Sequence, residues 1–306
     1  MQPYSFTRYL SAKKSVDDRA LNRQVWDSLV QALPPATQQS PLRVLEVGAG
    51  IGTMIERTAD WGLCHHAEYT AIDNQSDNIQ TARQRLERWG GAKGMQSRDH
   101  PQGISLKGDG QSIDILLETI DVYDLIAREG AAQRWDLLIA HAFLDLVDVA
   151  ALLPGLFGLL APGGCFYFSV NFDGLTLLEP EIDPELDELI LSHYHRTMDE
   201  RQSTGGCTNH SHTGRRLFTH LREAGANILA AGASDWLVFA RTSGYPADEA
   251  YFLHFILHTI HQALAGRPEL DPDQFAAWLA ARHAQVERGD LVYIAHQIDF
   301  CGYVHR

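Results

Sequence analysis

The sequence predicts an α/β fold in which a seven-stranded, mostly parallel sheet carries helices on both faces. Two observations predict it. Short apolar runs alternate along the chain with segments whose apolar residues recur at helical spacing, as in strands joined by crossover helices. The first core run, residues 43–47, also breaks into a turn with three glycines that leads straight into a helical segment. A chain of 306 residues is long enough for one large domain with additions or for two small domains.

The composition narrows the class of protein. The hydrophobic content of 45% and charged content of 21% are ordinary for a globular protein. The net charge of −14 repels polyphosphate, so nucleic acid is not expected as a partner. The chain has no apolar run of membrane-spanning length and no signal-peptide pattern, so we expect a cytoplasmic protein without a membrane partner. The widely spaced cysteines indicate neither a disulfide framework nor a standard zinc site.

Residues 1–40 precede the first strand and are expected to form a helical extension. Ser15 is a candidate N-cap, with Asp18 three residues further on. Apolar residues then recur at helical spacing as far as Leu33, and the prolines at positions 34 and 35 end the pattern. The sequence therefore predicts one amphipathic helix here, starting near Ser15.

The turn after the first strand has glycine at positions 48, 50 and 52. Glycine permits positive φ and lets a ligand approach the backbone closely, and the helix that follows offers unpaired N–H groups to a negative or polar ligand group. A dinucleotide site of the G-x-G-x-x-G type requires glycine at the position of Thr53. A nicotinamide-dependent oxidoreductase is therefore disfavoured, although tight binding of such a cofactor would revive it.

The second strand, residues 68–73, ends in Asp73, about twenty residues past the glycines. A carboxylate at this place can accept hydrogen bonds from both hydroxyls of a ribose. The alternative is that Asp73 caps the next helix, but Ser76 and Asp77 are better placed to do so. We therefore expect Asp73, with its neighbour Asn74, at a ribose site.

The third and fourth strands follow a loop at residues 90–110. Residues 104–106 and 113–117 are predicted to form a β-hairpin with Asp-Gly at its turn. Residues 135–140 form the fourth strand and end at His141. The carboxyl ends of parallel strands face the ligand crevice, so His141 is expected beside the reacting group.

The glycine spacing, with Glu46 two residues before it, resembles motif I of the class I S-adenosylmethionine (SAM)-dependent methyltransferases. The turn at residues 160–164, Leu-Ala-Pro-Gly-Gly, resembles the phrase before the fifth strand of that family. The resemblance covers about residues 41–172 and implies a Rossmann-like fold, SAM as cofactor, S-adenosyl-L-homocysteine as product, and methyl transfer. It also implies that the cofactor-binding residues are Glu46, Gly48, Ala49, Gly50, Gly52, Asp73, Asn74, Asp121, Val122, His141, Arg19 and Tyr9.

These implied roles differ in kind. The glycines pack under the methionine part of the cofactor, and Asp121 accepts from the adenine amino group while the backbone at Val122 reaches the ring. Asp124 is an alternative to Asp121. In similar enzymes a leading helix often covers the cofactor and substrate pocket, and one of its polar or basic residues, such as Tyr9 or Arg19, can meet the cofactor carboxylate.

Beyond residue 172 the chain departs from the common core. We expect a methyltransferase domain over residues 41–306, with insertions at about 173–215 and 244–289. The first insertion contains a helix at 184–198 and a small-residue loop at 202–212, expected to be a mobile substrate lid. A strand at 226–239, two helices and an antiparallel last strand at 290–300 follow. Cys207, His210 and His212 of the loop do not have a standard zinc spacing. The first of the two later helices carries His254, His258 and His261 on one face, but no carboxylate joins them, so no metal is expected.

The acceptor is expected to be a small molecule. The N-P-P-Y motif typical of amino-group methyltransferases for nucleic acids and proteins is absent at residues 140–143. A general base is needed only if the acceptor must lose a proton, and the candidate catalytic residues are His141, His195 and Tyr194. A non-catalytic SAM-binding or scaffold protein of the same fold is the alternative, and a homodimer is left open.

Overall fold

The computed structural model describes residues 4–108, 110–200 and 210–304. Its strands are β1 (Leu42–Val47), β2 (His66–Asp73), β3 (Gln96–His100), β4 (Gly103–Gly108), β5 (Gln111–Thr119), β6 (Trp135–His141), β7 (Leu160–Glu179), β8 (Ala226–Ala233), β9 (Trp236–Val238) and β10 (Val292–Val304). Its α-helices are α1 (Phe6–Ala20), α2 (Arg23–Ala32), α3 (Thr53–Asp60), α4 (Ser76–Ala92), α5 (Val122–Glu129), α6 (Val149–Leu159), α7 (Pro184–Asp199), α8 (Thr213–Glu223), α9 (Glu249–Leu264) and α10 (Pro272–Arg288).

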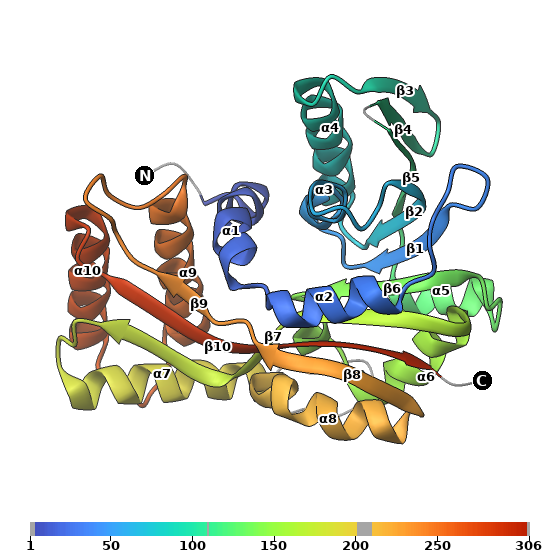
Figure 1. Cartoon of the computed structure of the whole chain (residues 1–306). Helices are drawn as coiled ribbons and strands as arrows, with labels where there is room; N and C mark the ends of the chain where they lie inside the picture. The colour runs from blue at the N-terminus through green and yellow to red at the C-terminus, as the bar shows by residue number, and fades with distance from the viewer. Residues whose placement is uncertain (1–3, 109, 201–209, 305–306) are drawn as a thin grey trace.

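The sheet has the order β3-β4-β5-β2-β1-β6-β7-β10-β8, and β9 pairs with β10 (Figure 1). Five neighbouring strands, β5-β2-β1-β6-β7, are parallel. β10 runs antiparallel between β7 and β8. These seven strands confirm the predicted core, and the antiparallel last strand lies inside the sheet beside β7.

The other edge of the sheet is a hairpin extended by one strand. β4 and β5 pair antiparallel from Gly103–Leu116 to Gly108–Gln111, as predicted, while Asp109 of the expected turn lies outside the described residues. The prediction of a continuous loop over residues 90–110 is wrong, because α4 extends to Ala92 and β3 pairs with β4. β3 has polar, mostly exposed side chains, so it lacks the apolar alternation that reveals a strand.

Alternation along the strands separates two apolar cores. On β1, Val44 belongs to one cluster and Leu45 to the other, because neighbouring side chains of a strand point to opposite faces. On β7, Tyr167 and Phe166 divide in the same way. Helices α1 to α4 contribute to the first cluster, and α5, α6 and α8 contribute to the second. The sheet is therefore covered on both faces, as the sequence predicts.

The N-terminal extension consists of two helices, so the prediction of one helix starting at Ser15 is wrong. Ser5 caps α1, and the side chain of Asn22 accepts from Val25 N to cap α2. The Ser15 hydroxyl instead donates to Glu249 of α9 at 2.7 Å from inside α1. α1 thus begins about three turns earlier than the capping pattern indicates.

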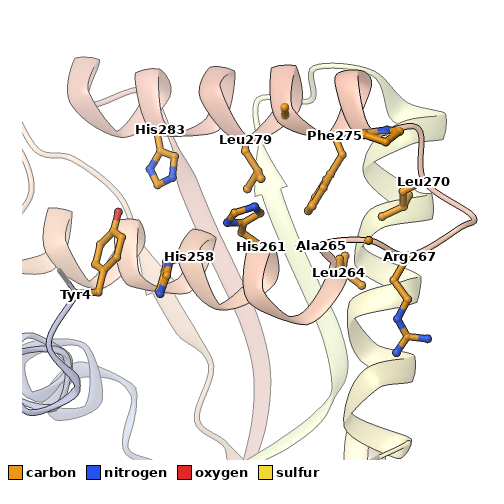
Figure 2. A pocket seen from close by; sticks show the side chains of 13 residues that line it. Tyr4, His258, His261, Leu264, Ala265, Arg267, Leu270, Phe275, Leu279 and His283 are labelled. Atoms are coloured by element: carbon orange, nitrogen blue, oxygen red, sulfur yellow. The ribbon is translucent and has the colours of Figure 1, made fainter. Parts of the chain in front are cut away.

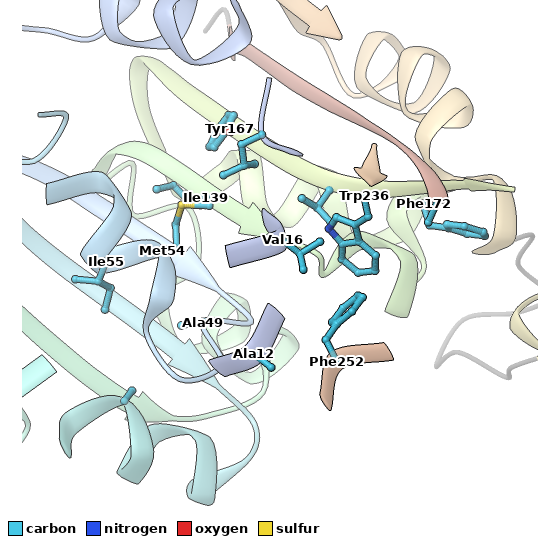
Figure 3. Packing of buried hydrophobic residues seen from close by; sticks show 14 of the residues in the cluster. Ala12, Val16, Ala49, Met54, Ile55, Ile139, Tyr167, Phe172, Trp236 and Phe252 are labelled. Carbon is cyan, nitrogen blue, oxygen red and sulfur yellow. The ribbon is translucent and has the colours of Figure 1, made fainter. Parts of the chain in front are cut away.

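α1 lies between the glycine-loop half of the sheet and α9 (Figure 1). Figure 3 shows Ala12 and Val16 of α1 in the same apolar cluster as Ala49 of the glycine turn, Trp236 of β9 and Phe252 of α9. The helix therefore joins the glycine turn to the C-terminal helices through buried contacts.

The C-terminal elements follow the prediction with two corrections. β7 continues to Glu179, so the expected insertion begins as an extended strand paired with β10. The expected strand over 226–239 is divided into β8 and β9 at Asp235, whose carboxylate accepts from His296 Nδ1 at 2.7 Å and Gln297 N at 3.2 Å. Most of the expected lid loop, residues 201–209, lies outside the described residues.

Within the described ranges, no helix combines the length and the apolar character needed to cross a membrane.

Candidate functional site

The glycine turn between β1 and α3 requires glycine for its backbone conformation. Gly48, Gly50 and Gly52 have φ of +67°, +54° and +78°, a region that side chains with a Cβ adopt at a cost. A Cβ built on Gly48 meets the Phe143 ring at 2.4 Å, and one on Gly50 meets Leu10 of α1 at 3.3 Å. Ala49 N donates to Ile72 O at 2.9 Å, which fastens the turn to the end of β2. The turn is therefore a tightly packed backbone loop at the carboxyl end of the central strands.

Asp73 at the end of β2 holds this loop in place. Its Oδ2 accepts from Gly50 N at 2.9 Å, and its Oδ1 accepts from Gln75 N at 2.9 Å and from Asn78 Nδ2 at 3.1 Å. Asn74 beside it is exposed. A carboxylate has about four lone-pair positions, so Asp73 keeps acceptor capacity for a further donor.

The expectation that Ser76 or Asp77 caps the next helix is wrong. α4 begins at Ser76, and its N-cap is Gln75, whose side chain makes no capping hydrogen bond. Asp73 itself accepts from Gln75 N, just before the helix. Asp73 thus connects the glycine turn, β2 and the start of α4.

Glu46 lies inside the protein rather than at the loop. It is 1% exposed, and its Oε2 accepts from the Tyr69 hydroxyl of β2 at 2.7 Å. Burial raises the pKa of Glu46 to about 8, which the bond from Tyr69 only partly offsets. At neutral pH the side chain is therefore largely protonated, and it supports the β1–β2 pair from within the core.

Asp121 and Val122 are found at the end of β5, beside the end of β2. Ile120 N donates to Asp73 O at 3.1 Å, which joins the two strand ends. Asp121 is the N-cap of α5 and accepts from Tyr123 N at 2.9 Å, and Val122 is the first residue of that helix. The alternative residue, Asp124, lies in the first turn of the helix, beyond the strand end.

His141 belongs to a buried polar network that the sequence analysis did not foresee. Its Nε2 lies 2.9 Å from Asp17 Oδ2 of α1, and its Nδ1 lies 2.9 Å from Ser169 Oγ of β7. Lys13 Nζ donates to the same Asp17 oxygen at 2.7 Å, and Trp236 Nε1 donates to the other at 2.9 Å. All five side chains are buried or nearly so, which makes the network the main polar link between α1 and the sheet.

The charges of this network are fixed by its surroundings. Burial lowers the pKa of His141 to about 4, with the Lys13 ammonium adding to the effect and Asp17 opposing it. Burial alone would raise the pKa of Asp17, but Lys13, His141 and Arg57 hold it well below its usual range. At neutral pH His141 is therefore neutral beside an ionised Asp17, so Nε2 donates to Asp17 and Nδ1 accepts from Ser169. In this arrangement neither ring nitrogen is open to a proton from an acceptor molecule.

Tyr194 and His195 lie on α7 with different surroundings. His195 Nε2 lies 3.0 Å from Thr176 Oγ1, and burial lowers the pKa of this histidine to about 4, with His212 adding to the effect. Tyr194 is buried and is close enough to Tyr9 to contribute to raising its pKa, which burial raises first. The structure therefore groups Tyr194 with α1 and His195 with β7.

Tyr9 and Arg19 of α1 both contact α9. The Tyr9 ring is stacked on Phe255 with centroids 4.2 Å apart. Arg19 Nη1 and Nη2 donate to the two oxygens of the buried Glu249 carboxylate at 2.5 and 2.8 Å. The Arg19 guanidinium is therefore occupied by Glu249, whereas Lys13 of the same helix lies beside His141 in the buried network.

Comparison with known proteins identifies the fold. No protein-family model matches the sequence, and no curated protein matches it significantly. A candidate type II methyltransferase from Anaeromyxobacter dehalogenans superposes with a TM-score of 0.50 at 18% identity, over 93% of this chain and 97% of the other. A candidate methyltransferase from Haloferax volcanii, solved with the activator Trm112, gives 0.46 at 14% identity over 99% and 98%. A candidate sarcosine dimethylglycine methyltransferase from Galdieria sulphuraria gives 0.44 at 12% over 95% and 86%.

Only the first of these superpositions, with a TM-score of 0.50, supports a conclusion, and that conclusion concerns the fold. The chain has the class I methyltransferase fold, with the glycine turn at the position that the resemblance of motif I implies. The same fold can host different activities, so the function must be argued from the site.

Proposed function

We propose that this protein is a SAM-dependent methyltransferase that acts on a small molecule. The observation that carries the proposal is the glycine turn, with three positive φ angles, which is tied through Gly50 N to a carboxylate at the end of the next strand. This arrangement joins an approachable backbone to an acceptor for hydroxyl groups at the carboxyl ends of parallel strands, where ligands of open α/β sheets bind.

The residues at these strand ends fit a nucleoside with an amino-acid tail. Gly48, Gly50 and Gly52 lie where the methionine part would pass over the backbone, and Asp73 retains acceptor capacity for the ribose hydroxyls. Asp121 uses Oδ1 to cap α5, which leaves its other oxygen for the adenine amino group, next to Val122. Asn74 is exposed beside this path.

The methionine carboxylate would meet the cations near α1. Lys13 is buried beside His141 and donates to Asp17, and its ammonium has further N–H groups. Arg57 of α3 is also buried, and its Nε donates to Asp18 at 2.6 Å. The Nη2 of Arg57 lies 3.9 Å from Asp17 and has no hydrogen-bond partner in the described structure. Arg19 is less suited because Glu249 occupies its guanidinium. We therefore assign the carboxylate to Lys13 and Arg57, with Tyr9 holding α1 against α9.

SAM supplies the electrophilic methyl group, and the protein supplies alignment of the acceptor with it. His141 acts as a positioning residue, because it connects the end of β6 to Asp17 of α1 through a neutral imidazole. For an acceptor that must lose a proton, Tyr194 and His195 are the remaining candidates. The acidic chain favours an acceptor that is not a polyanion.

A methyl-transfer screen tests the proposal. The protein is incubated with methyl-labelled SAM and a fractionated extract of small metabolites, and label is followed into new compounds. We expect label in at least one compound with wild type and with Asp77→Ala, which changes an exposed acid on α4. With Asp73→Ala we expect at least a tenfold loss of rate. Label transfer that Asp73→Ala leaves intact would contradict the assigned cofactor site.

One observation favours a second function, a non-catalytic SAM-binding or scaffold protein. Phe143 and Leu10 pack directly on the glycines, and the buried network holds α1 over the turn. If this packing is permanent, a methyl acceptor cannot reach a cofactor bound at the glycine turn. That function predicts binding of S-adenosyl-L-homocysteine without any labelled product across the extract fractions.

A further inference from the structure

A pocket of about 500 Å³ lies between α9 and α10, away from the glycine turn (Figure 2). Its apolar surface comes from side chains on both helices and the turn that joins them: Leu264, Leu270, Phe275 and Leu279. Imidazoles project into the same space, as Figure 2 shows for His258, His261 and His283. The size and the mixture of apolar walls with a few polar groups are those of a small-molecule site.

The groups at the two ends of the pocket favour a ligand that has an aromatic ring and a negative charge. At one end Tyr4, just before α1, is stacked on His258 with centroids 4.4 Å apart. At the other end lies Arg267, whose guanidinium donates through Nη2 to Glu200 and has further N–H groups. The aromatic rings of Tyr4 and Phe275 offer faces for stacking, and Arg267 offers a fixed positive charge.

The charge of the lining is unusual for this chain. Although the chain has a net charge of −14, no acidic side chain is present among the residues that line the pocket in the described structure. Burial lowers the pKa of His258 and of His283, so these rings are mainly neutral near pH 7 and each carries one N–H. The lining thus combines neutral imidazoles with one cation, whose carboxylate partner Glu200 lies outside the lining.

The imidazoles are not arranged to hold a metal. His254 Nδ1 and His283 Nδ1 lie 2.7 Å apart, which is a direct hydrogen bond between the two rings. Over the described part of the chain, no three histidine, cysteine or acidic side chains converge as a metal site. The histidines along one face of α9, His254, His258 and His261, therefore make ring contacts and hydrogen bonds along the pocket.

We propose that the pocket between α9 and α10 is a binding site for a small organic anion with an aromatic body. The acidic group lies toward Arg267 and His261, and the aromatic body lies against Phe275 and Leu279. The proposal does not require SAM binding, because the pocket is lined by α9, α10, the turn that joins them and Tyr4, and by no residue of the glycine turn.

The test uses two fluorescent probes that share an aromatic body. The anion 1-anilinonaphthalene-8-sulfonate is titrated against its neutral counterpart, N-phenyl-1-naphthylamine, without SAM or its product. We expect one saturable site for the anion, with at least tenfold higher affinity than for the neutral probe. Equal affinities would overturn the proposal, since the cation would then contribute nothing.

Two pairs of variants locate the probe. Ala276→Trp fills the pocket, whereas Ala277→Trp adds the same side chain at an exposed neighbouring position outside the lining. We expect anion binding to be lost only in the first. Arg267→Gln should weaken the anion about tenfold and leave the neutral probe unchanged, while Arg196→Gln, in the same surface ion-pair network, should have no effect. Anion binding that survives both Ala276→Trp and Arg267→Gln would place the probe elsewhere and refute the site.

Discussion

At the scale of single residues, Gly48 leaves no room for a side chain beside the ring of Phe143. An alanine Cβ at position 48 would lie 2.4 Å from the ring, and the backbone there has a φ of +67°. We predict that Gly48→Ala lowers the free energy of unfolding by about 1–2 kcal/mol for the left-handed backbone and by about 1–3 kcal/mol more for overpacking. Urea denaturation measures the total.

Gly225→Ala separates these two contributions. Gly225 has a φ of +82°, but an added Cβ meets nothing within 4 Å, so only the backbone cost remains. Adding Phe143→Ala to Gly48→Ala should recover part of the overpacking cost. If Gly48→Ala and Gly225→Ala cost the same, the ring does not pack on the glycine as described.

Glu46 gives the protein a specific pH dependence. Its pKa is about 8 in the folded state and near 4.5 when unfolded, so between these values the folded state binds more protons. The free energy of unfolding therefore falls as pH rises, by up to about 1.4 kcal/mol per pH unit for this one proton. We predict that Glu46→Gln removes this fall, so that the stability of the variant relative to wild type increases from pH 5 to pH 8.

The control for this prediction is Glu68→Gln on the neighbouring strand. Glu68 is exposed, so its replacement should leave the pH profile of unfolding parallel to that of wild type. Because both variants are compared with wild type at each pH, the titration of all other groups cancels. A Glu46→Gln profile parallel to wild type would mean that Glu46 is ionised in the folded protein.

Residues within one motif could be predicted from the sequence, and residues brought together by packing could not. Gly48, Gly50 and Asp73 follow from spacing, because a strand, a turn and a second strand fix their relative positions. Asp17 and His141 are 124 residues apart, and their contact depends on how α1 docks. The side chain of Glu46 was expected at the loop because spacing does not reveal that a residue two positions before the glycines points into the core.

At the scale of elements, α1 is held by charges that are buried on both sides. Removing one partner of a buried pair leaves the other uncompensated, which costs about 3–5 kcal/mol. We predict a loss of this size for Asp17→Asn, because Lys13, His141 and Trp236 all bond to that carboxylate. Thermal or urea unfolding followed by circular dichroism measures it.

An exposed ion pair between α1 and α9 provides the control. Arg8 bonds to Asp248 at the start of α9, and both side chains are about half exposed. Exposed pairs contribute less than about 1 kcal/mol, so Arg8→Gln should change stability only slightly. Equal effects of Asp17→Asn and Arg8→Gln would show that the network does not fasten α1.

Elements with strong apolar periodicity were predicted well, and those defined by local capping or polar pairing were not. α10 and the core strands match their expected positions because burial imposes a pattern on them. The break between α1 and α2 depends on Asn22, which caps α2 while its Nδ2 donates to Ala233 O and its N donates to Asp299. Those partners are far away in sequence, so the break leaves no local signal.

At the scale of the whole molecule, two cores on one twisted sheet place the glycine turn, Asp73 and Asp121 along the same edge. The parallel direction of the core strands followed from the alternation of strands and helices, since each parallel crossover needs a helix. What the additions around this core do could not be predicted, because α1, α7 and α9 acquire their roles only by packing together. The proposed cofactor site therefore depends on both parts, the core for its acceptors and for Arg57, and α1 for Lys13.

The most direct test of this account is isothermal titration calorimetry with S-adenosyl-L-homocysteine. Wild type and Asp77→Asn should bind one equivalent with a dissociation constant in the micromolar range, about −8 kcal/mol. Asp73→Asn should bind at least tenfold more weakly, because the amide replaces an acceptor that the ribose and Gly50 N share. No heat of binding with wild type, or the same affinity in Asp73→Asn, would contradict the assignment of the glycine turn as a SAM site.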